Sequence, residues 1–396
     1  MELPEGFQFA GVHAGIKDTP GKLDVSLIVC ADGATAAGVY TQNLFFAAPV
    51  RWDRERTPND NVVAIVVNSG NANACTGRRG WQDAVRMAQS TATACGVQAE
   101  QVLVMSTGVI GVFLPMECVD QGIAAAYAAL GSSPADFRLA SEGILTTDQG
   151  SKTAFRSVEL TGGTNICLAA MAKGAGMIGP SMATLLGMVL TDAALTPDDA
   201  QRVLTAAVDV SFNAISVEGH TSTNDTILFM ASGKKVAAPL VGDDLERLAM
   251  ALTDLCIELA KMIPDDGEGA THLIEIDVSG CRTAVDAGRI ARTIASSALV
   301  KTAVAGGDPN WGRVMSAAGY AGVDFDVHRS CLWINETLIF SQGNPVEFDE
   351  LMLSQSMKAS RETKLRIQFA EGDAGACFWT RDLTVDYVNF NADYRT

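Results

Sequence analysis

The residues best suited to chemistry lie in a glycine-rich segment near the middle of this 396-residue chain. The segment reads Lys173-Gly-Ala-Gly-Met-Ile-Gly-Pro-Ser-Met-Ala-Thr184, and an apolar run follows it. The three glycines allow backbone conformations that other residues avoid, whereas the proline fixes its own φ angle. This combination is typical of a tight turn. The pattern predicts a turn that delivers Thr184 to the start of a buried strand.

A threonine in such a turn could cut its own chain. If the turn strains the Ala183–Thr184 peptide, the Thr184 hydroxyl can attack the Ala183 carbonyl and move the acyl group from nitrogen to oxygen. Hydrolysis of that ester frees the α-amine of Thr184, whose ordinary pKa of about 7.7–8.0 suits a general base near neutral pH. Thr184 and its own amine would then form an activated nucleophile without a histidine.

Two plainer interpretations fit the same residues. An Ala-Thr pair before an apolar run is usually an ordinary strand start. The glycines could also form a phosphate-binding loop, although the spacing of a P-loop and of a dinucleotide-binding turn is missing. The local pattern alone therefore leaves the chemistry open.

The elements that must position this segment alternate between strands and helices, which predicts an α/β fold. In the first half, residues 61–67 form a β-branched run typical of a strand covered on both faces. A helix is expected over residues 81–95, ended by Gly96, and a strand over 101–105. The Asn- and Gly-rich stretches 68–77 and 106–111 are expected to be loops.

The second half repeats the alternation. Residues 196–199 have the capping threonine, proline and acidic first turn of a helix start, and an apolar stripe predicts a helix over 243–262. Further strands are expected at residues 273–278, 365–369 and 376–380, with a hairpin formed by 331–334 and 337–340.

The composition excludes several classes of function. The chain has 29 Lys and Arg against 46 Asp and Glu, a formal net charge of −17, which disfavours binding to nucleic acid or anionic membranes. Any anionic ligand must therefore be met by local cations or backbone amides. The longest apolar stretch, residues 177–190, is too short and too broken by Gly and Pro to span a bilayer.

The cysteines and the N-terminus indicate a cytoplasmic protein. Nine cysteines are scattered without a C-x-x-C pair, which fits a reducing compartment better than a disulfide framework. With four histidines as well, the scatter argues against a structural zinc site. The first residues lack the basic start and apolar run of a signal peptide.

A series of motifs, in order along the whole chain, resembles the ornithine acetyltransferase family, also called bifunctional glutamate N-acetyltransferase. The central motifs are Lys173 to Ile178, Met182-Ala-Thr184 and Thr191-Asp192. The other matching blocks are residues 68–77, 106–111, 144–148, 221–225, 266–270, 299–302, 308–313 and 391–396.

The resemblance implies a specific architecture and reaction. It implies a layered α/β sandwich, cut between Ala183 and Thr184 into an α chain (1–183) and a β chain (184–396) that interlock in one folded unit. Two α and two β chains would form a heterotetramer. The cut Thr184 would accept acetyl from N-acetylornithine and pass it to glutamate in a ping-pong scheme of arginine biosynthesis. No metal or cofactor is implied, although acetyl-CoA could serve as a co-substrate.

The resemblance also assigns roles to individual residues. Thr107 and Gly108 would form the oxyanion hole. The substrate contacts it implies are Thr147, Lys173, Thr184, Glu268, Asn391 and Thr396. Each has a plainer alternative: 106–111 could be a simple turn, Lys173 a solvated charge, Glu268 a loop carboxylate and the C-terminal tail a frayed end. For Trp311 and Arg313, in block 308–313, we expect a structural role.

Three segments depart from the family pattern. Gln149-Gly-Ser151 replaces the usual Thr and Pro-Lys step, Val217-Glu-Gly-His220 replaces Val-Asp-Gly-Asp, and Gly179-Pro-Ser181 replaces Ala-Pro-Asn. They leave the substrates less determined than the nucleophile. The alternatives are a self-cleaving N-terminal-threonine amidohydrolase or peptidase, a transacetylase of specialised metabolism, and an uncut structural paralogue.

Overall fold

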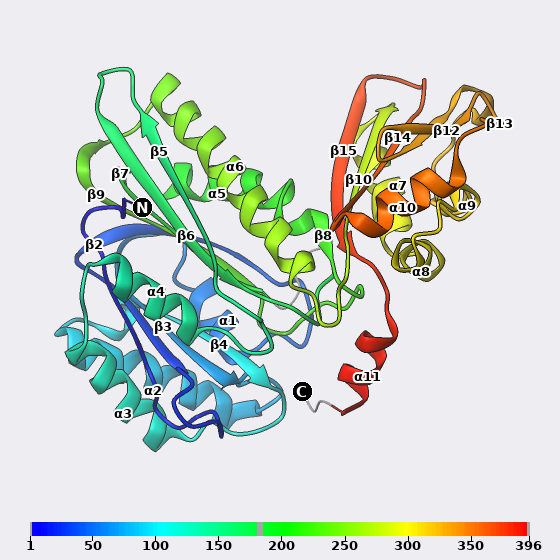
Figure 1. The fold of residues 1–396 in the computed structure, drawn as a ribbon. Coiled ribbons are helices and arrows are strands. Elements are labelled where there is room, and N and C mark those ends of the chain that lie inside the picture. Colours follow the sequence, from blue (N-terminus) through cyan, green and yellow to red (C-terminus); the bar gives the residue numbers. More distant parts are fainter. Residues whose placement is uncertain (1, 180–184, 394–396) are drawn as a thin grey trace. The chain divides into compact units, whose positions relative to one another are not determined.

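The computed structural model describes residues 2–179 and 185–393, which form two compact units (Figure 1). The first unit holds the described residues of Met1–Phe212 and Thr221–Ala260. The second holds those of Asn213–His220 and Lys261–Tyr394. Ala183, Thr184 and Thr396 lie outside the described residues. Each unit is built on its own sheet, so the α/β expectation is confirmed.

The first unit contains an eight-stranded sheet with the order β4-β3-β2-β9-β7-β6-β5, and β1 pairs with β2. Its pairs are antiparallel except β3–β4 and β7–β9. The strands are β1 (Gln8–Val12), β2 (Val25–Tyr40), β3 (Asn59–Asn71), β4 (Val102–Val109), β5 (Lys152–Glu159), β6 (Asn165–Lys173), β7 (Leu186–Ala194) and β9 (Thr226–Pro239).

The 16-residue strand β2 joins two halves of this sheet. Its residues 25–29 pair with β1 and β3, whereas residues 35–40 pair with β9. Side chains from both halves meet in one buried core, where Ile65 and Leu103 of β3 and β4 join Met188 and Met230 of β7 and β9. The two halves therefore pack as facing layers, which brings the ends of distant strands together.

Helices cover the outer faces of the first unit. Met87 of α2 and Val119 of α3 share a core with Val104 of β4, and α5 and α6 run beside the sheet of the first unit (Figure 1). Arg156 of β5 and Glu258 of α6 form an ion pair at 2.6 Å. The helices are α1 (Ala48–Arg54), α2 (Gly77–Cys95), α3 (Met116–Ala128), α4 (Pro134–Gly143), α5 (Pro197–Asp209) and α6 (Gly242–Asp265), with a 3₁₀ turn η1 (Ala99–Gln101).

The second unit has a seven-stranded sheet in the order β13-β12-β11-β14-β10-β15-β8. The hairpin of β11 and β12 is confirmed, and its two turn residues, Asn335 and Glu336, both have positive φ. The strands are β8 (Ile215–Ser216), β10 (Leu273–Cys281), β11 (Cys331–Ile334), β12 (Thr337–Ser341), β13 (Asn344–Pro345), β14 (Glu362–Gln368) and β15 (Ala374–Arg381). The helices are α7 (Ala284–Ala295), α8 (Ala298–Gly306), α9 (Trp311–Gly319), α10 (Glu350–Ala359) and α11 (Val385–Asp393), with 3₁₀ turns η2 (Phe212–Ala214) and η3 (Val327–Arg329).

Local signals located several elements correctly. Gly96 ends α2 in the left-handed conformation with φ of 71°, as expected of a helix C-terminus. The side chain of Thr196 accepts a hydrogen bond from the Asp199 N–H at the start of α5. The strand expected at residues 61–67 is buried throughout except at Asn61.

The two polar stretches predicted as loops are partly strand. β3 continues to Asn71 and β4 to Val109, because Asn68, Ser69 and Gly70 pair in parallel with residues 106–108. The side chains are satisfied within the ladder, since Ser106 Oγ donates to Asn68 Oδ1 at 2.6 Å. Helix α2 also begins earlier than predicted, at Gly77.

No helix in the described ranges is long and apolar enough to cross a membrane.

A buried carboxylate fastens the loop before β2. The oxygens of Asp24 accept hydrogen bonds from the backbone N–H groups of residues 14–17 at 2.6–3.1 Å. Lys17, at the end of that loop, donates from Nζ to the carbonyls of Leu23 (2.6 Å) and Leu145 (2.7 Å). Asp24 therefore holds the backbone of Lys17 in place, and the Lys17 side chain connects this loop to the segment that leads into residues 146–148.

We expect Asp24→Ala to lower the free energy of unfolding by about 3 kcal/mol, because four backbone donors lose a charged acceptor. Urea denaturation measures the change. Asp32→Ala is the matched control on the adjoining strand β2, since Asp32 forms an exposed ion pair with Lys234 whose loss costs less than about 1 kcal/mol. Equal small losses in both variants would contradict the role of Asp24.

Candidate active site

Two predicted site residues from different strands meet in the first unit. Lys173 is the last residue of β6 and Thr107 lies near the end of β4. Lys173 Nζ donates a hydrogen bond to Thr107 Oγ1 at 2.9 Å. Both side chains are buried, with exposed fractions of 2% and 3%. Lys173 is thus a buried cation and not a solvated surface charge.

Gly108 occupies a backbone conformation that other residues rarely adopt. Its φ is 135°, and a Cβ placed on it would lie 2.2 Å from the carbonyl carbon of Gly70. The close approach of β3 and β4 therefore requires glycine at this position. Residues 106–108 form the end of a strand whose last residues have an unusual geometry, which the interpretation as a simple turn did not foresee.

Asp148 balances the charge of Lys173. Its Oδ1 accepts from Lys152 Nζ at 2.7 Å and from the Gly174 N–H at 2.6 Å, and its Oδ2 accepts from the Thr146 N–H at 3.1 Å. Burial alone would raise the pKa of Asp148, but the charges of Lys173 and Lys152 and these hydrogen bonds lower it to about 2. Asp148 is therefore ionised at neutral pH.

Lys17 adds a third cation to this region. Burial lowers the pKa of Lys17 to about 8; the charge of Asp24 opposes this shift and that of Lys173 adds to it. Its hydrogen bond to the Leu145 carbonyl holds the chain just before Thr147, which is half-buried in the same turn as Asp148. A local excess of positive charge thus exists within a strongly acidic protein, as an anionic ligand would require.

The chain directly after Thr184 is held by the matching block 221–225, to whose residues the sequence analysis assigned no role. The N–H of Leu185 donates to Asp225 Oδ1 at 2.8 Å. The neighbouring Asn224 donates from Nδ2 to the carbonyls of Ala72 (2.6 Å) and Ser106 (2.7 Å). This segment therefore connects the start of β7 with the end of β4. Its polar block before a strand was visible in the sequence, but its partners were not.

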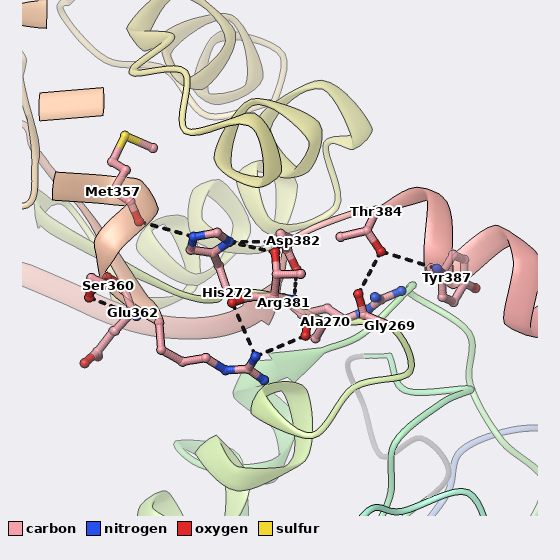
Figure 2. Close-up of polar contacts among 12 residues, drawn as sticks. Gly269, Ala270, His272, Met357, Ser360, Glu362, Arg381, Asp382, Thr384 and Tyr387 are labelled. Atoms are coloured by element: carbon pink, nitrogen blue, oxygen red, sulfur yellow. Dashed lines mark hydrogen bonds and ion pairs between the residues drawn. The ribbon is translucent and has the colours of Figure 1, made fainter. Parts of the chain in front are cut away.

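In the second unit, Glu268 and Asn391 contact each other. Asn391 Nδ2, on α11, donates to Glu268 Oε2 at 3.1 Å. The loop that carries Glu268 is held by the segment that leads into α11 (Figure 2). Arg381 Nη1 donates to the Glu268 carbonyl and Thr384 Oγ1 to the Gly269 carbonyl, both at 2.7 Å.

Further contacts fix the same loop from its other side (Figure 2). The Thr271 N–H donates to Asp382 Oδ1 at 3.0 Å, and the His272 ring nitrogens lie 3.2 Å from Asp382 Oδ2 and from the Met357 carbonyl. Arg361 Nη1 donates to the Ala270 carbonyl at 3.1 Å. Glu268 is therefore a buried, anchored carboxylate and not a mobile loop charge.

Two of the three departures from the family pattern fall on exposed or charge-conserving positions; in the third, Gly179 is buried, and Pro180 and Ser181 lie outside the described residues. Gln149 has a polar contact within the structure, whereas Gly150 and Ser151 are exposed, as is His220. Glu218 keeps a negative charge whose field raises the pKa of Lys301 and of Arg381. Burial nevertheless lowers the pKa of Lys301 to about 8.

Trp311 and Arg313 make contacts of a structural kind within the second unit. The Trp311 ring stacks on Phe340 with a centroid distance of 5.3 Å, and Arg313 Nη1 donates to the Leu299 carbonyl at 2.9 Å. Among the described residues, no group of three His, Cys, Asp or Glu side chains could hold a metal ion.

We expect Asp148→Asn to lower the free energy of unfolding at pH 7 by about 2 kcal/mol. The folded pKa of about 2 lies below the ordinary value of 3.8, so this stabilisation exists above about pH 4 and is lost as the pH falls through about 2. The gap between wild type and variant should therefore narrow across that interval in denaturation curves.

Asp254→Asn, on an exposed part of α6, is the control, and its free energy of unfolding should stay within about 0.5 kcal/mol of the wild-type value. If the Asp148→Asn variant differed from wild type in free energy of unfolding by as much at pH 2 as at pH 7, the assigned charge state would be contradicted.

Known proteins similar to this chain agree with the sequence motifs. The ArgJ family model matches residues 8–396. The arginine biosynthesis bifunctional protein ArgJ of Rhodopirellula baltica is 47% identical over all of this chain and 96% of its own length.

Two solved structures match parts of the chain. ArgJ of Bacillus halodurans is 38% identical with a TM-score of 0.51, covering 52% of this chain and 98% of that one. An ornithine acetyltransferase of Mycobacterium tuberculosis, solved in complex with ornithine, is 36% identical with a TM-score of 0.41, covering 45% and 93%. The family match spans almost the whole sequence, so the chain belongs to the ArgJ family, the ornithine acetyltransferases that its motifs resemble.

Proposed function

We propose that this chain transfers acetyl from N-acetylornithine to glutamate through an ester on Thr184. The observation that carries the proposal is the buried contact between Lys173 and Thr107. It joins the implied substrate lysine to the implied oxyanion residue, although the two are 66 positions apart in sequence. Membership of the ArgJ family supports the same reaction.

Thr107 is suited to stabilise an oxyanion. Its Oγ1 accepts a hydrogen bond from the Lys173 ammonium, so its own proton is available to donate. The nearby positive charge makes that proton a stronger donor in a buried site. Together with the backbone of Gly108, it would meet the negative charge that develops on the acetyl carbonyl oxygen.

The proposed reaction has two balanced halves. The Thr184 amine takes the hydroxyl proton as Oγ bonds to the acetyl carbon of N-acetylornithine, and the same proton passes to the ornithine nitrogen as the carbon–nitrogen bond breaks. In the second half, the neutral amine of glutamate attacks the ester carbon, a carbon–nitrogen bond forms as the carbon–oxygen bond to Thr184 breaks, and a proton from the glutamate nitrogen passes through the Thr184 amine to Oγ, which restores the hydroxyl. Two covalent steps of this kind predict ping-pong kinetics.

The nucleophile requires a prior cut between Ala183 and Thr184, giving the α chain 1–183 and the β chain 184–396. The length of the solved Bacillus halodurans chain supports this proposal, because nearly all of it matches only about half of the present chain. We propose that the α and β chains stay interlocked in one layered α/β fold and assemble as two α and two β chains. The cytoplasmic location also stays a prediction.

The charged residues suggest how the enzyme recognises its substrates. Lys173 would attract a substrate carboxylate, while the anchored Glu268 would take the side-chain ammonium of ornithine. Thr147, Asn391 and Thr396 would complete the substrate contacts. Acetyl-CoA is proposed as a second donor for glutamate, in keeping with relatives described as bifunctional; release of free CoA from acetyl-CoA and glutamate tests it.

A self-cleaving hydrolase is the second candidate, because the same acetyl ester could be attacked by water. Acetate release and acetylglutamate formation distinguish the two. We expect acetylglutamate to form at least tenfold faster than acetate when both N-acetylornithine and glutamate are present.

We expect the purified wild-type chain to give two masses that correspond to residues 1–183 and 184–396, and Thr184→Ala to give one uncut chain without activity. N-acetylornithine alone should add one acetyl group to the β chain, since no acceptor removes it. Intact-mass spectrometry measures both effects. An active wild-type enzyme that consists of a single uncut chain would contradict the proposal.

We expect Thr107→Val to lower kcat by about 10²–10³-fold, the usual cost of removing one oxyanion donor. KM for N-acetylornithine should change by less than about threefold, because the hydroxyl acts on the transition state. Thr107→Ser keeps the hydroxyl and should stay within about fivefold of wild-type kcat. Steady-state kinetics on the fully cut enzyme measures both constants. A Thr107→Val variant as active as Thr107→Ser would exclude Thr107 as an oxyanion donor.

A further inference from the structure

Asp225 is a buried carboxyl group whose placement the proposed reaction does not yet explain. Its side chain has no exposed surface. One oxygen, Oδ1, accepts from the Leu185 N–H at 2.8 Å. The other, Oδ2, has no partner at hydrogen-bond geometry among the described residues, although Ser222 lies near enough to lower the pKa of the group. A buried polar atom without a partner costs free energy, and Asp225 bears this cost directly beside the residue that follows Thr184.

The surroundings leave this carboxyl group little freedom. The Asp225 carbonyl accepts from the Thr41 N–H at 2.9 Å, and the Leu185 carbonyl accepts from the Thr226 N–H at 3.1 Å. The neighbouring Asn224 is fixed by its two bonds to the carbonyls of Ala72 and Ser106. Asp225 therefore holds Leu185 in a fixed relation to the strand that carries Thr107.

The burial of Asp225 suits a site with an amine base. Burial raises its pKa well above the ordinary range, although the Leu185 N–H, the charge of Lys173 and Ser222 all act in the opposite direction. A neutral acid can hydrogen-bond an amine without forming an ion pair. An ionised carboxylate would instead stabilise the ammonium form, which cannot accept a proton.

We propose that Asp225 is the positioning residue for Thr184. One oxygen fixes the backbone immediately after the nucleophile through Leu185, and the other hydrogen-bonds the α-amine once the cut has created it. This inference rests on the proposed function. It also accounts for Oδ2, because in the continuous chain the amine that would be its partner does not yet exist.

The cut that Asp225 assists is balanced in atoms and protons. The Thr184 oxygen bonds to the Ala183 carbonyl carbon as the carbon–nitrogen bond breaks, and the hydroxyl proton moves to the nitrogen. Water then hydrolyses the ester, which leaves a carboxyl group on Ala183 and restores the hydroxyl of Thr184. A fixed backbone at Leu185 keeps the hydroxyl aligned with that carbonyl.

The chain offers a closely matched control in Asp53. It is also fully buried, its Oδ1 accepts from the Val104 N–H at 2.8 Å, and its Oδ2 likewise has no partner among the described residues. Burial raises its pKa as well. Asp53 lies on α1 against β4 and does not contact Leu185, so its variants measure the cost of removing such a group for folding alone.

The experiment follows the cutting of full-length chains after pulse labelling in cell-free synthesis, for wild type and for Asn and Ala variants of Asp225 and Asp53. We expect Asp225→Ala to cut at least tenfold more slowly than wild type. Asp225→Asn keeps an acceptor for Leu185 and should cut within about threefold of wild type. Both Asp53 variants should cut at the wild-type rate at temperatures where they remain folded.

Kinetics on fully cut Asp225→Asn test the second part of the proposal. An amide offers its single oxygen to Leu185 and loses the acid facing the amine, so kcat should fall about tenfold with KM within threefold. The inference is overturned if Asp225→Ala cuts within twofold of wild type, if Asp225→Asn is as slow as Ala or keeps wild-type kcat, or if Asp53→Ala is equally slow. An uncut, inactive wild type would instead overturn the proposed function itself.

Discussion

The buried ammonium of Lys173 imposes the constraint around which the first unit's site is organised. An isolated charge in the interior costs several kcal/mol unless it is paired and hydrogen-bonded. Asp148 supplies the opposite charge and Thr107 the acceptor. Because these partners come from the turn before β5 and from the end of β4, the cation can be buried only when both are in place. The contacts that stabilise the Lys173 ammonium therefore also bring the residues of the candidate site together.

The second unit contains a buried acidic residue that, like Lys173 in the first unit, is held by several contacts. Glu268 is a buried carboxylate, and its loop is held by contacts from β15, α11 and the segment between them (Figure 2). Gly269, in the left-handed region with φ of 74°, lies so close to the Tyr387 N–H that a Cβ would approach it to 2.6 Å. The C-terminal segment is thus a structural support for the loop as well as the carrier of Asn391.

Much of the secondary structure follows from local sequence, because caps, glycine stops and apolar periodicity act within a few residues. Thr196 and Gly96 are examples that the structure confirms. The errors arise where partners are distant: Ser106 stays in a strand because it pairs with Asn68, 38 positions away. Family resemblance gave Lys173 and Thr107 separate roles, but neither it nor local sequence predicted their hydrogen bond or the contacts of Asp225.

The charge pattern explains why the acidic character of the chain and its proposed substrates are compatible. The net charge of −17 repels anions at long range, but salt screens that field beyond about 10 Å. Within the site, Lys152 and Lys173 face the ionised carboxylate of Asp148, whereas the charge of Asp24 acts on Lys17 more strongly than that of Asp148. Burial raises the pKa of Asp225, which disfavours a second negative charge there. A second carboxylate beside Lys173 would cancel the local field and trap the α-amine of Thr184 as ammonium, so the burial of Asp225 favours both substrate attraction and the proposed base.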